Sequence, residues 1–212
     1  MSVEARSVSD GRPGLFAHKT ARLYLDVDGC VCPFGRPDPA WGETAHSAVP
    51  VVYDDGRTAT YEVRWAPALI VAIDELRERF NLELVWLSTW NEADAVRRFL
   101  VPELRGFTDG RLLQFDPESV APNVPSGWWK ARHIIEEQST DPLPFIWADD
   151  AEVELHGWRV LNATLPTKSL MVPPHPMVGL RMADVQAMTV WLEALAKSGN
   201  AGGGNTHDAA SS

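Results

Sequence analysis

Two aspartates that end an apolar segment are the residues of this sequence best suited to chemistry. Asp26 and Asp28 follow Leu23-Tyr24-Leu25 and precede Gly29. Residues two apart on a strand point the same way, so both carboxylates are expected to face one reacting centre. One could attack a phosphoryl group, while the other protonates the leaving oxygen and later activates water. Gly29 would let the backbone turn away sharply.

A second acidic pair, Asp149 and Asp150, follows the apolar segment 144–148. Adjacent carboxylates after a buried strand are costly unless they are solvated or bind a cation. Mg²⁺ prefers carboxylate oxygens and keeps several of its waters, so such a pair suits it. Aspartates also cap helix N-termini, and on this pair alone both interpretations stay open.

Three further polar residues have a chemical and a structural interpretation. Ser88 and Thr89 follow the apolar segment 82–87, where hydroxyls and free backbone N–H groups can hold a phosphate oxygen or cap a helix. Lys130 lies near the start of a predicted helix. Its ammonium could neutralise a phosphoryl group and an attacking carboxylate, although a lone lysine is usually a surface charge.

Strands that alternate with helices would place these side chains together. Apolar strands are predicted from residue 21, over 82–87 and over 144–148, with shorter strands at 112–115 and 158–161. Predicted helices cover 68–80, which Pro67 opens, 91–100, 128–137, with Ser126 as a candidate cap, and 182–196. This order predicts the α/β fold class, with a Rossmann-like parallel sheet flanked by helices. Ligands of such sheets bind beyond the carboxyl ends of the strands.

The insert between the first strand and the first helix, about residues 33–66, is small. Residues 33–50 are predicted as a loop, and strands at 51–53 and 58–65 as a β-hairpin around Asp55-Gly56. A large lid is therefore not expected over the site.

Length and charge limit the remaining possibilities. The 212 residues fit one domain, predicted at 19–197, between a flexible arm at 1–18 and a Gly- and Ser-rich disordered tail at 198–212. The net charge of −10 argues against a broad basic surface for stable duplex nucleic-acid binding, and an anionic substrate would need a cation at the site. No membrane span or signal peptide is seen, which favours the cytoplasm. Cys30 and Cys32 are expected to be reduced.

In chain order, four motifs resemble those of the haloacid dehalogenase-like (HAD) superfamily of phosphohydrolases. They read LYLDVDG, LVWLS, GWWK and FIWADD, within a resemblance that covers about residues 21–196. The resemblance implies a HAD-like fold with the small hairpin insert in place of a large cap, and a Mg²⁺-dependent phosphatase. Many members have Thr where this chain has Cys30, whose thiol is a weaker hydrogen-bonding group.

The resemblance also implies roles for individual residues. Asp26 would be the nucleophile that forms an aspartyl-phosphate, Asp28 the general acid and base, and Lys130 the group that stabilises the phosphoryl charge. The substrate would be contacted by Ser88, with Thr89 as a fallback, and by Gly29 and Trp90. Mg²⁺ would be held by Asp26, by Asp28 through its backbone carbonyl, and by Asp149 and Asp150.

A more specific resemblance concerns the substrate. The short cap, LVWLSTW and the late segment PPHPMVGL look like HAD domains of bacterial RNA-repair proteins. This implies a nucleotide or a 5′- or 3′-phosphate on a nucleic-acid end, besides phosphorylated small molecules. Most of the nine tryptophans are expected in the core. Trp90 or Trp128 could instead line the pocket and stack on a base or sugar.

Two other functions compete with a phosphatase. A dehalogenase-type hydrolase would also use an aspartate nucleophile, but displacing a halide needs neither a metal nor a protonated leaving group. A non-catalytic binding domain could keep the fold without the acids, yet all the expected acids are present. The six histidines are interpreted as non-catalytic: His18, His46, His133, His156, His175 and His207.

Overall fold

A parallel five-stranded sheet forms the centre of the protein. The structure, a computed structural model, describes residues 19–115 and 128–201. The strand order is β5-β4-β1-β6-β7, and each neighbouring pair is parallel. The strands are β1 (Ala21–Leu25), β4 (Leu82–Trp86), β5 (Arg111–Leu112), β6 (Phe145–Ala148) and β7 (Ser169–Val172).

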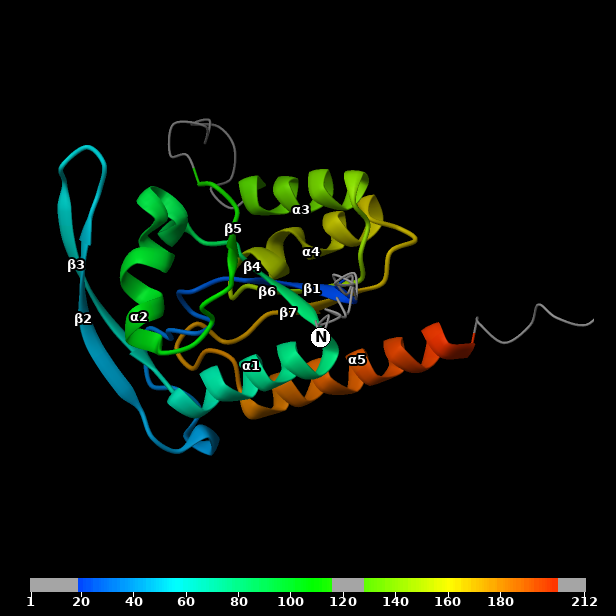
Figure 1. Cartoon of the computed structure of the whole chain (residues 1–212), viewed down its shortest axis with the longest axis horizontal. Helices are drawn as coiled ribbons and strands as arrows, with labels where there is room; N and C mark the ends of the chain where they lie inside the picture. Colours follow the sequence, from blue (N-terminus) through cyan, green and yellow to red (C-terminus); the bar gives the residue numbers. More distant parts are fainter. Residues whose placement is uncertain (1–18, 116–127, 202–212) are drawn as a thin grey trace, which may run out of the picture.

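Helices cover both faces of this sheet (Figure 1). Helices α1 (Pro67–Phe80) and α5 (Met182–Ala201) lie side by side on one face. Helices α3 (Trp128–Thr140) and α4 (Glu152–Ala163) pack together on the other. The predicted α/β class with a parallel sheet between helices is therefore confirmed.

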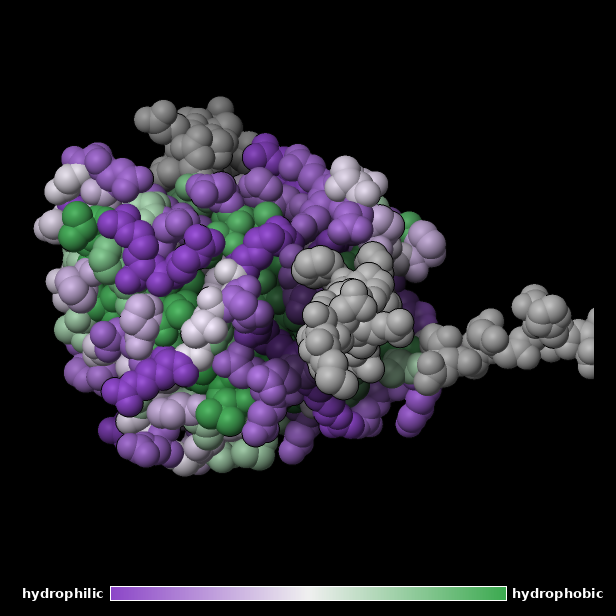
Figure 2. Space-filling view, in the orientation of Figure 1, coloured by the Kyte–Doolittle hydropathy of each residue, from purple (hydrophilic) through white to green (hydrophobic). Residues whose placement is uncertain are grey.

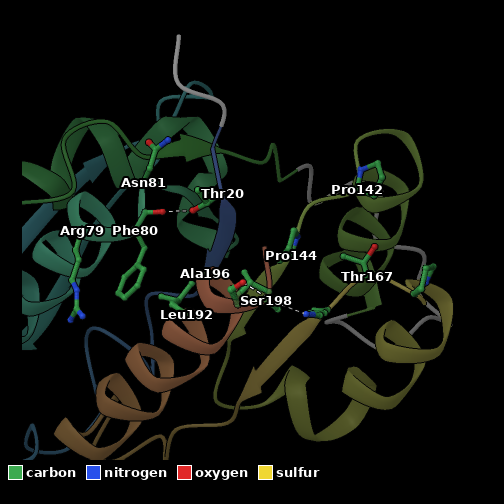
Figure 3. A pocket seen from close by; sticks show the side chains of 13 residues that line it. Thr20, Arg79, Phe80, Asn81, Pro142, Pro144, Thr167, Leu192, Ala196 and Ser198 are labelled. Atoms are coloured by element: carbon green, nitrogen blue, oxygen red, sulfur yellow. Dashed lines mark hydrogen bonds between the residues drawn. The ribbon is translucent and has the colours of Figure 1, made fainter. Parts of the chain in front are cut away.

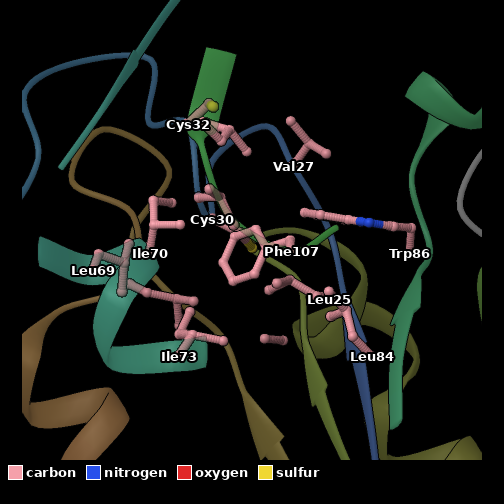
Figure 4. Packing of buried hydrophobic residues seen from close by; sticks show 14 of the residues in the cluster. Leu25, Val27, Cys30, Cys32, Leu69, Ile70, Ile73, Leu84, Trp86 and Phe107 are labelled. Atoms are coloured by element: carbon pink, nitrogen blue, oxygen red, sulfur yellow. The ribbon is translucent and has the colours of Figure 1, made fainter. Parts of the chain in front are cut away.

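Side chains alternate along β1 and fill two separate cores. Leu25 faces the α1 side and lies in the larger cluster with Ile73, Trp86 and Phe107 (Figure 4). Tyr24 faces the α3 side and packs in the smaller cluster. Because each fully buried apolar side chain contributes roughly 1.5–3 kcal/mol, these two layers hold the strands firmly beneath the loops that follow them.

The hairpin insert is longer than the sequence pattern predicts. After a short 3-10 helix η1 (Pro39–Trp41), β2 (Ala45–Val52) pairs with β3 (Thr58–Trp65) over its full length. The prediction of a loop over residues 45–50 is wrong, because these residues alternate between exposed and more buried positions as a strand does. Pro50 is tolerated because the sheet has only two strands, so each strand has a free edge.

The segment after β4 is helical but irregular. It runs through the 3-10 helix η2 (Thr89–Asp94), the π-helix η3 (Val96–Leu100) and α2 (Val101–Leu104). The helix predicted over 91–100 is present from Ala95 onward, but Ala93 and Asp94 adopt φ angles of 53° and 57°, which interrupt it before that point. The kink lets Trp90 and Glu92 lie beside the hairpin.

The predicted strand at 158–161 is also wrong, since these residues belong to α4. Val153, His156, Gly157 and Val160 form the buried face of that helix at the spacing of an α-helix. The fifth strand of the sheet is instead β7, which the sequence pattern did not reveal. The strand predicted at 112–115 is the shorter β5.

Some predictions concern the chain ends and the segment before α3. The arm at 1–18 with His18, the helix cap at Ser126, and His207 lie outside the described residues. Helix α5 continues to Ala201, which is four residues into the predicted tail.

Within 19–115 and 128–201, no helix is both long and apolar enough to cross a membrane. Hydrophilic side chains cover most of α3 on the face shown in Figure 2.

Candidate active site

The polar residues predicted to form a site follow three adjacent strands. Asp26, Ser88 and Asp149 come after β1, β4 and β6, which are neighbours in the order β4-β1-β6. The backbone N–H of Asp26 donates to the carbonyl of Ala148 at 3.0 Å, which extends the strand pairing to the site. The parallel sheet therefore brings distant parts of the sequence to one edge.

Lys130 joins two of the carboxylates. Its Nζ lies 2.5 Å from Asp26 Oδ2 and 2.7 Å from Asp149 Oδ2. All three residues are buried, and Asp149 has no exposed surface. Lys130 is therefore not a surface charge but the cation at the centre of the acid cluster. It comes from the first turn of α3, whose buried apolar residues pack against β1, β4 and β6.

The acid cluster has one more carboxylate. Asp26, Asp149 and Asp150 each offer an oxygen, and these oxygens all lie within 4.8 Å of one another. The other oxygen of Asp149 accepts from the backbone N–H groups of Ala151 and Glu152 at the start of α4. Asp149 thus serves as a helix cap and as a member of the cluster, so the two interpretations of its sequence position hold together.

Burial and charge shift the pKa values of these groups. Burial raises the pKa of Asp26 to about 7, against the lowering effect of Lys130. Burial and the charge of Asp149 also raise the pKa of Asp150. Burial works to lower the pKa of Lys130, but Asp26 and Asp149 raise it above its usual value. The cluster therefore keeps Lys130 charged and still lacks positive charge.

Asp28 lies beside the cluster and has a different partner. Its Oδ2 accepts a hydrogen bond from the indole N–H of Trp90 at 3.0 Å. Burial raises the pKa of Asp28, and the bond from Trp90 lowers it in part. A carboxyl group with a raised pKa can hold the proton that a general acid donates.

Gly29 allows Asp150 to approach the loop after β1. Gly29 has a φ of +68°, and a Cβ atom built on it would lie 2.3 Å from Asp150 Cγ. A larger residue at position 29 would push the Asp150 carboxylate away. Close packing is thus one reason for a glycine at position 29, and its contact with a substrate stays a prediction. Cys30 and Cys32, also in this loop, are buried and free, as expected.

Ser88 and Thr89 separate at the end of β4. Ser88 is buried, accepts the backbone N–H of Trp90 at 3.4 Å as a helix cap, and hydrogen bonds to Asp26, which lowers the pKa of that carboxyl. Thr89 is exposed and lines a small cavity beside Asp28. Ser88 is therefore the hydroxyl next to the nucleophile candidate, and Thr89 faces outward.

Sequence reasoning missed the residues that the hairpin brings to the site. Tyr53 and Tyr61 lie next to Trp90 in the same cavity, and Arg57 forms an ion pair with Glu92 at 2.7 Å. Two of the three tyrosines of the chain lie in this hairpin, which is a signal that was available. The sequence did not show where the two tyrosine side chains point, because this depends on where the hairpin packs.

The late segment PPHPMVGL supports the loop after β1. The backbone N–H of Phe34 donates to Pro176, and that of Leu180 donates to Cys30. Gly179 passes so close that a Cβ atom there would lie 2.4 Å from the Cys30 carbonyl oxygen. The segment thus packs against the loop of the first motif, which gives it a structural role.

A second aromatic group lies on α3 and α4. Trp128 packs edge-on against His156 at 5.4 Å between ring centroids, and Arg159 lies over both Trp128 and Trp158. His156 is buried, and its ring nitrogens have no hydrogen-bond partner within the part of the chain that the structure describes. Trp86, Trp129 and Trp147 are core residues, as expected for most tryptophans.

The donor set fits a hard divalent cation. Three carboxylates and one ammonium leave a formal excess of two negative charges in a mostly buried cluster. All ligand atoms are oxygens, which Mg²⁺ prefers. The raised pKa values of Asp26 and Asp150 point the same way, because both groups lack compensating charge. The residues therefore fit the magnesium ion that the superfamily implies.

A larger cavity lies at the other end of the sheet. It has a volume of about 860 Å³ and is lined by residues that precede strands, among them Thr20, Asn81, Pro144 and Lys168 (Figure 3). Ligands of parallel sheets bind at the carboxyl ends of strands, where the acid cluster is. This cavity is thus separate from the candidate active site.

The parallel α/β sheet with its acid cluster defines a HAD-superfamily domain. Residues 22–185 match the family described as "HAD domain in Swiss Army Knife RNA repair proteins", and the chain belongs to this family. The match confirms the resemblance drawn from the four motifs. No curated protein and no solved structure matches the chain. HAD domains are generally hydrolases that depend on an aspartate.

Proposed function

We propose that the protein is a Mg²⁺-dependent phosphomonoester hydrolase that acts through an aspartyl-phosphate. One observation carries the proposal: Asp26 directly follows the central strand β1, next to Lys130 and two other carboxylates, with Asp28 two residues further on. The side chains that would serve as nucleophile, as cation for the phosphoryl charge and as proton donor thus lie close together.

The reaction needs two steps. A carboxylate oxygen of Asp26 attacks phosphorus, the bond from phosphorus to the leaving oxygen breaks, and Asp28 gives its proton to that oxygen. Asp28, now a carboxylate, takes a proton from water, whose oxygen attacks the aspartyl-phosphate. The bond between phosphorus and Asp26 then breaks. Inorganic phosphate leaves, and both side chains return to their starting states.

Other residues would position the phosphoryl group. Lys130 would neutralise its oxygens, and Ser88 would donate a hydrogen bond to one of them. Asp26, Asp149 and Asp150, with the backbone carbonyl of Asp28, would hold Mg²⁺. When bound, the ion would offset the negative charge of the cluster and of the phosphoryl group.

The proposed substrates are nucleotides or phosphorylated nucleic-acid ends. The description of the family supports this class, since RNA repair acts on strand ends. The insert supports it as well, because the stretch between β1 and α1 holds only η1 and the hairpin. Such an insert leaves room for a strand end that a closed lid would exclude.

Hydrolysis of p-nitrophenyl phosphate tests the proposal. Activity is expected with Mg²⁺ and not with EDTA, and Asp26→Asn should abolish it. Asp54→Asn, an exposed aspartate of the hairpin turn, is the matched control and should keep it. The Mg²⁺ concentration that gives half-maximal activity should be higher for the Asp149→Ala variant than for the wild type.

Three results would contradict the proposal. Hydrolysis of p-nitrophenyl phosphate that ignores EDTA would show that the reaction needs no metal. Release of halide from a haloacid, without turnover of phosphomonoesters, would favour a dehalogenase-type hydrolase, which the presence of Asp28 and of the 149–150 acid pair argues against. Absence of turnover on every phosphomonoester, with intact folding, would favour a non-catalytic binding domain.

A further inference from the structure

A small cavity lies directly beside Asp28, between the hairpin and η2. Its volume is about 120 Å³, and its walls include Asp28, Tyr53, Tyr61, Thr89, Trp90 and Glu92. An apolar cavity of about 150 Å³ accommodates one benzene ring. The space beside Asp28 is therefore on the scale of a single ring.

Aromatic side chains form one wall of this cavity. The rings of Tyr61 and Trp90 lie 5.0 Å apart between centroids, at an angle of 52°. Trp90 is 7% exposed and is held by its bond to Asp28, whereas Tyr61 is 39% exposed and reaches solvent. The hydroxyls of Tyr53 and Tyr61 are hydrogen bonded at 2.6 Å. Tyr61 thus offers a supported ring face at the cavity rim.

An ion pair fastens the hairpin to the site. Arg57, in the hairpin turn, binds Asp55 at 2.5 Å and Glu92 of η2 at 2.7 Å. Its guanidinium also lies 4.4 Å from the centroid of the Tyr53 ring. The tip of the hairpin is therefore attached to the segment that follows β4, so the aromatic wall is formed before any ligand binds.

The position of Asp28 indicates which part of the substrate this cavity binds, if Asp28 is the general acid of the proposed function. A general acid must lie within hydrogen-bonding distance of the oxygen that it protonates. The leaving oxygen must then lie next to Asp28, and the group attached to it must lie beside Asp28 as well. The cavity is the space that the described residues leave there.

We propose that Tyr61 and Trp90 bind the terminal nucleoside of the substrate as the leaving group. The base would stack on the exposed ring of Tyr61 at the cavity rim, as bases stack on aromatic residues in other proteins regardless of sequence. The Glu92 carboxylate, whose Oε1 pairs with Arg57, would accept a hydrogen bond from that nucleoside through its other oxygen. The pocket therefore selects the end of a strand, while the rest of the strand stays in solvent.

Paired RNA substrates test this proposal. One short single-stranded RNA carries its phosphate on an ordinary terminal nucleotide, and its partner carries it on an abasic terminal nucleotide, with 5′ and 3′ versions of each pair. The ratio of kcat/KM within a pair measures the contribution of the base. We expect roughly a ten-fold preference for the base-bearing RNA at one end.

Three variants locate the preference. Tyr61→Leu should reduce it to less than about three-fold, with most of the change in KM, while Tyr61→Phe should retain it because the ring remains. Trp158→Leu removes an exposed aromatic side chain from α4, outside this cavity, and should leave it unchanged. The abasic RNA should be hydrolysed equally by all four proteins.

Several outcomes would overturn the proposal. In Tyr61→Leu, an unchanged preference, or an equal loss on both members of a pair, would show that Tyr61 does not contact the base. Loss of the preference in Trp158→Leu would move the site to α4. Faster hydrolysis of a phosphotyrosine peptide than of any RNA would replace the nucleoside by a protein side chain.

Binding of adenosine separates this proposal from the proposed function. Quenching of tryptophan fluorescence by adenosine, with ribose as the control ligand, needs no catalysis. If no phosphomonoester is hydrolysed but adenosine binds and Tyr61→Leu weakens it several-fold, the phosphatase assignment fails and the nucleoside pocket stands. If adenosine does not bind and the base gives no preference, the pocket is wrong.

Discussion

Two charge clusters at opposite ends of strand β1 differ in their balance of charge, the first partly buried and the second mostly buried. Near the start of β1, Arg22 binds Glu83 at 2.8 Å, and Arg111 binds Glu83 and Glu137 at 2.7 and 2.5 Å. Two guanidinium groups thus face two carboxylates. Arg22 also pairs with a third carboxylate, that of Asp141, which is 70% exposed. After the end of β1, three carboxylates share the single ammonium of Lys130.

The pKa values reflect this difference. Burial works to raise the pKa of Glu83, but Arg111 and Arg22 lower it below its usual value. Burial raises the pKa of Asp26, and Lys130 does not offset it. One cluster therefore satisfies its own charges and serves the fold. The other is left short of positive charge, which is the state expected of a site that binds a cation and a phosphoryl group.

The largest expected effect is on turnover when the unbalanced cluster loses its nucleophile. Asp26→Asn should reduce kcat by on the order of 10³-fold or more, since no other group can form the intermediate. The melting temperature without Mg²⁺ should stay equal or rise, because one excess charge is removed. Steady-state kinetics and thermal unfolding measure both. A clear loss of stability would mean that the cluster is structural.

The balanced cluster should respond in the opposite way. Arg22→Met should lower the free energy of unfolding by about 3 kcal/mol, because it removes the ion pairs that the buried Arg22 forms with Glu83 and Asp141. For the folded fraction, kcat/KM should change less than about three-fold, as the substitution lies away from the acid cluster. Urea unfolding followed by fluorescence gives the first value. A large loss of kcat/KM in fully folded protein would contradict the division of roles.

Removal of the proton donor should have an intermediate effect. Asp28→Asn should slow turnover at least ~10²-fold while the fold stays intact, which is the usual result of losing a general acid. The loss should be smaller for p-nitrophenyl phosphate than for an alkyl phosphate, because nitrophenolate leaves without a proton. An equal loss on both substrates would argue for another role of Asp28.

The smallest expected effect is on the pH dependence of stability. Because the folded pKa of Glu83 is lowered, its contribution is present above the unfolded pKa of about 4.5 and is lost as pH falls through the folded value. The free energy of unfolding of Glu83→Gln should therefore be lower than that of the wild type at pH 6. This difference should become smaller as the pH falls. Urea unfolding over this pH range measures the difference. A difference that stays constant would show that Glu83 is not held by its arginines.

The sequence was sufficient for the central part of the fold because three strands consist mostly of apolar residues on both faces. The segments at β1, β4 and β6 are short, apolar and followed by polar residues, so their type and order were predictable. Helix α4 was harder, since Leu155, Trp158 and Leu161 are apolar but exposed. These residues hide the helical period of its buried face.

The acid cluster could be predicted only as a set of residues. Parallel strands require their carboxyl ends to meet, which places Asp26 near Asp149. The position of Lys130 between them, and the packing of Asp150 on Gly29, depend on loops and helix placement that no local pattern contains. The same holds for Tyr61, which reaches Trp90 only because the hairpin packs on η2.

Trapping of the covalent intermediate tests the central claim most directly. The protein would be mixed with p-nitrophenyl phosphate and Mg²⁺, quenched in acid within the first turnovers, and digested for mass spectrometry. The peptide that contains Asp26 should carry a hydroxylamine-sensitive phosphoryl group, which EDTA and Asp26→Asn should each eliminate. Turnover with this peptide unmodified, or a phosphoryl group on another residue, would contradict the account.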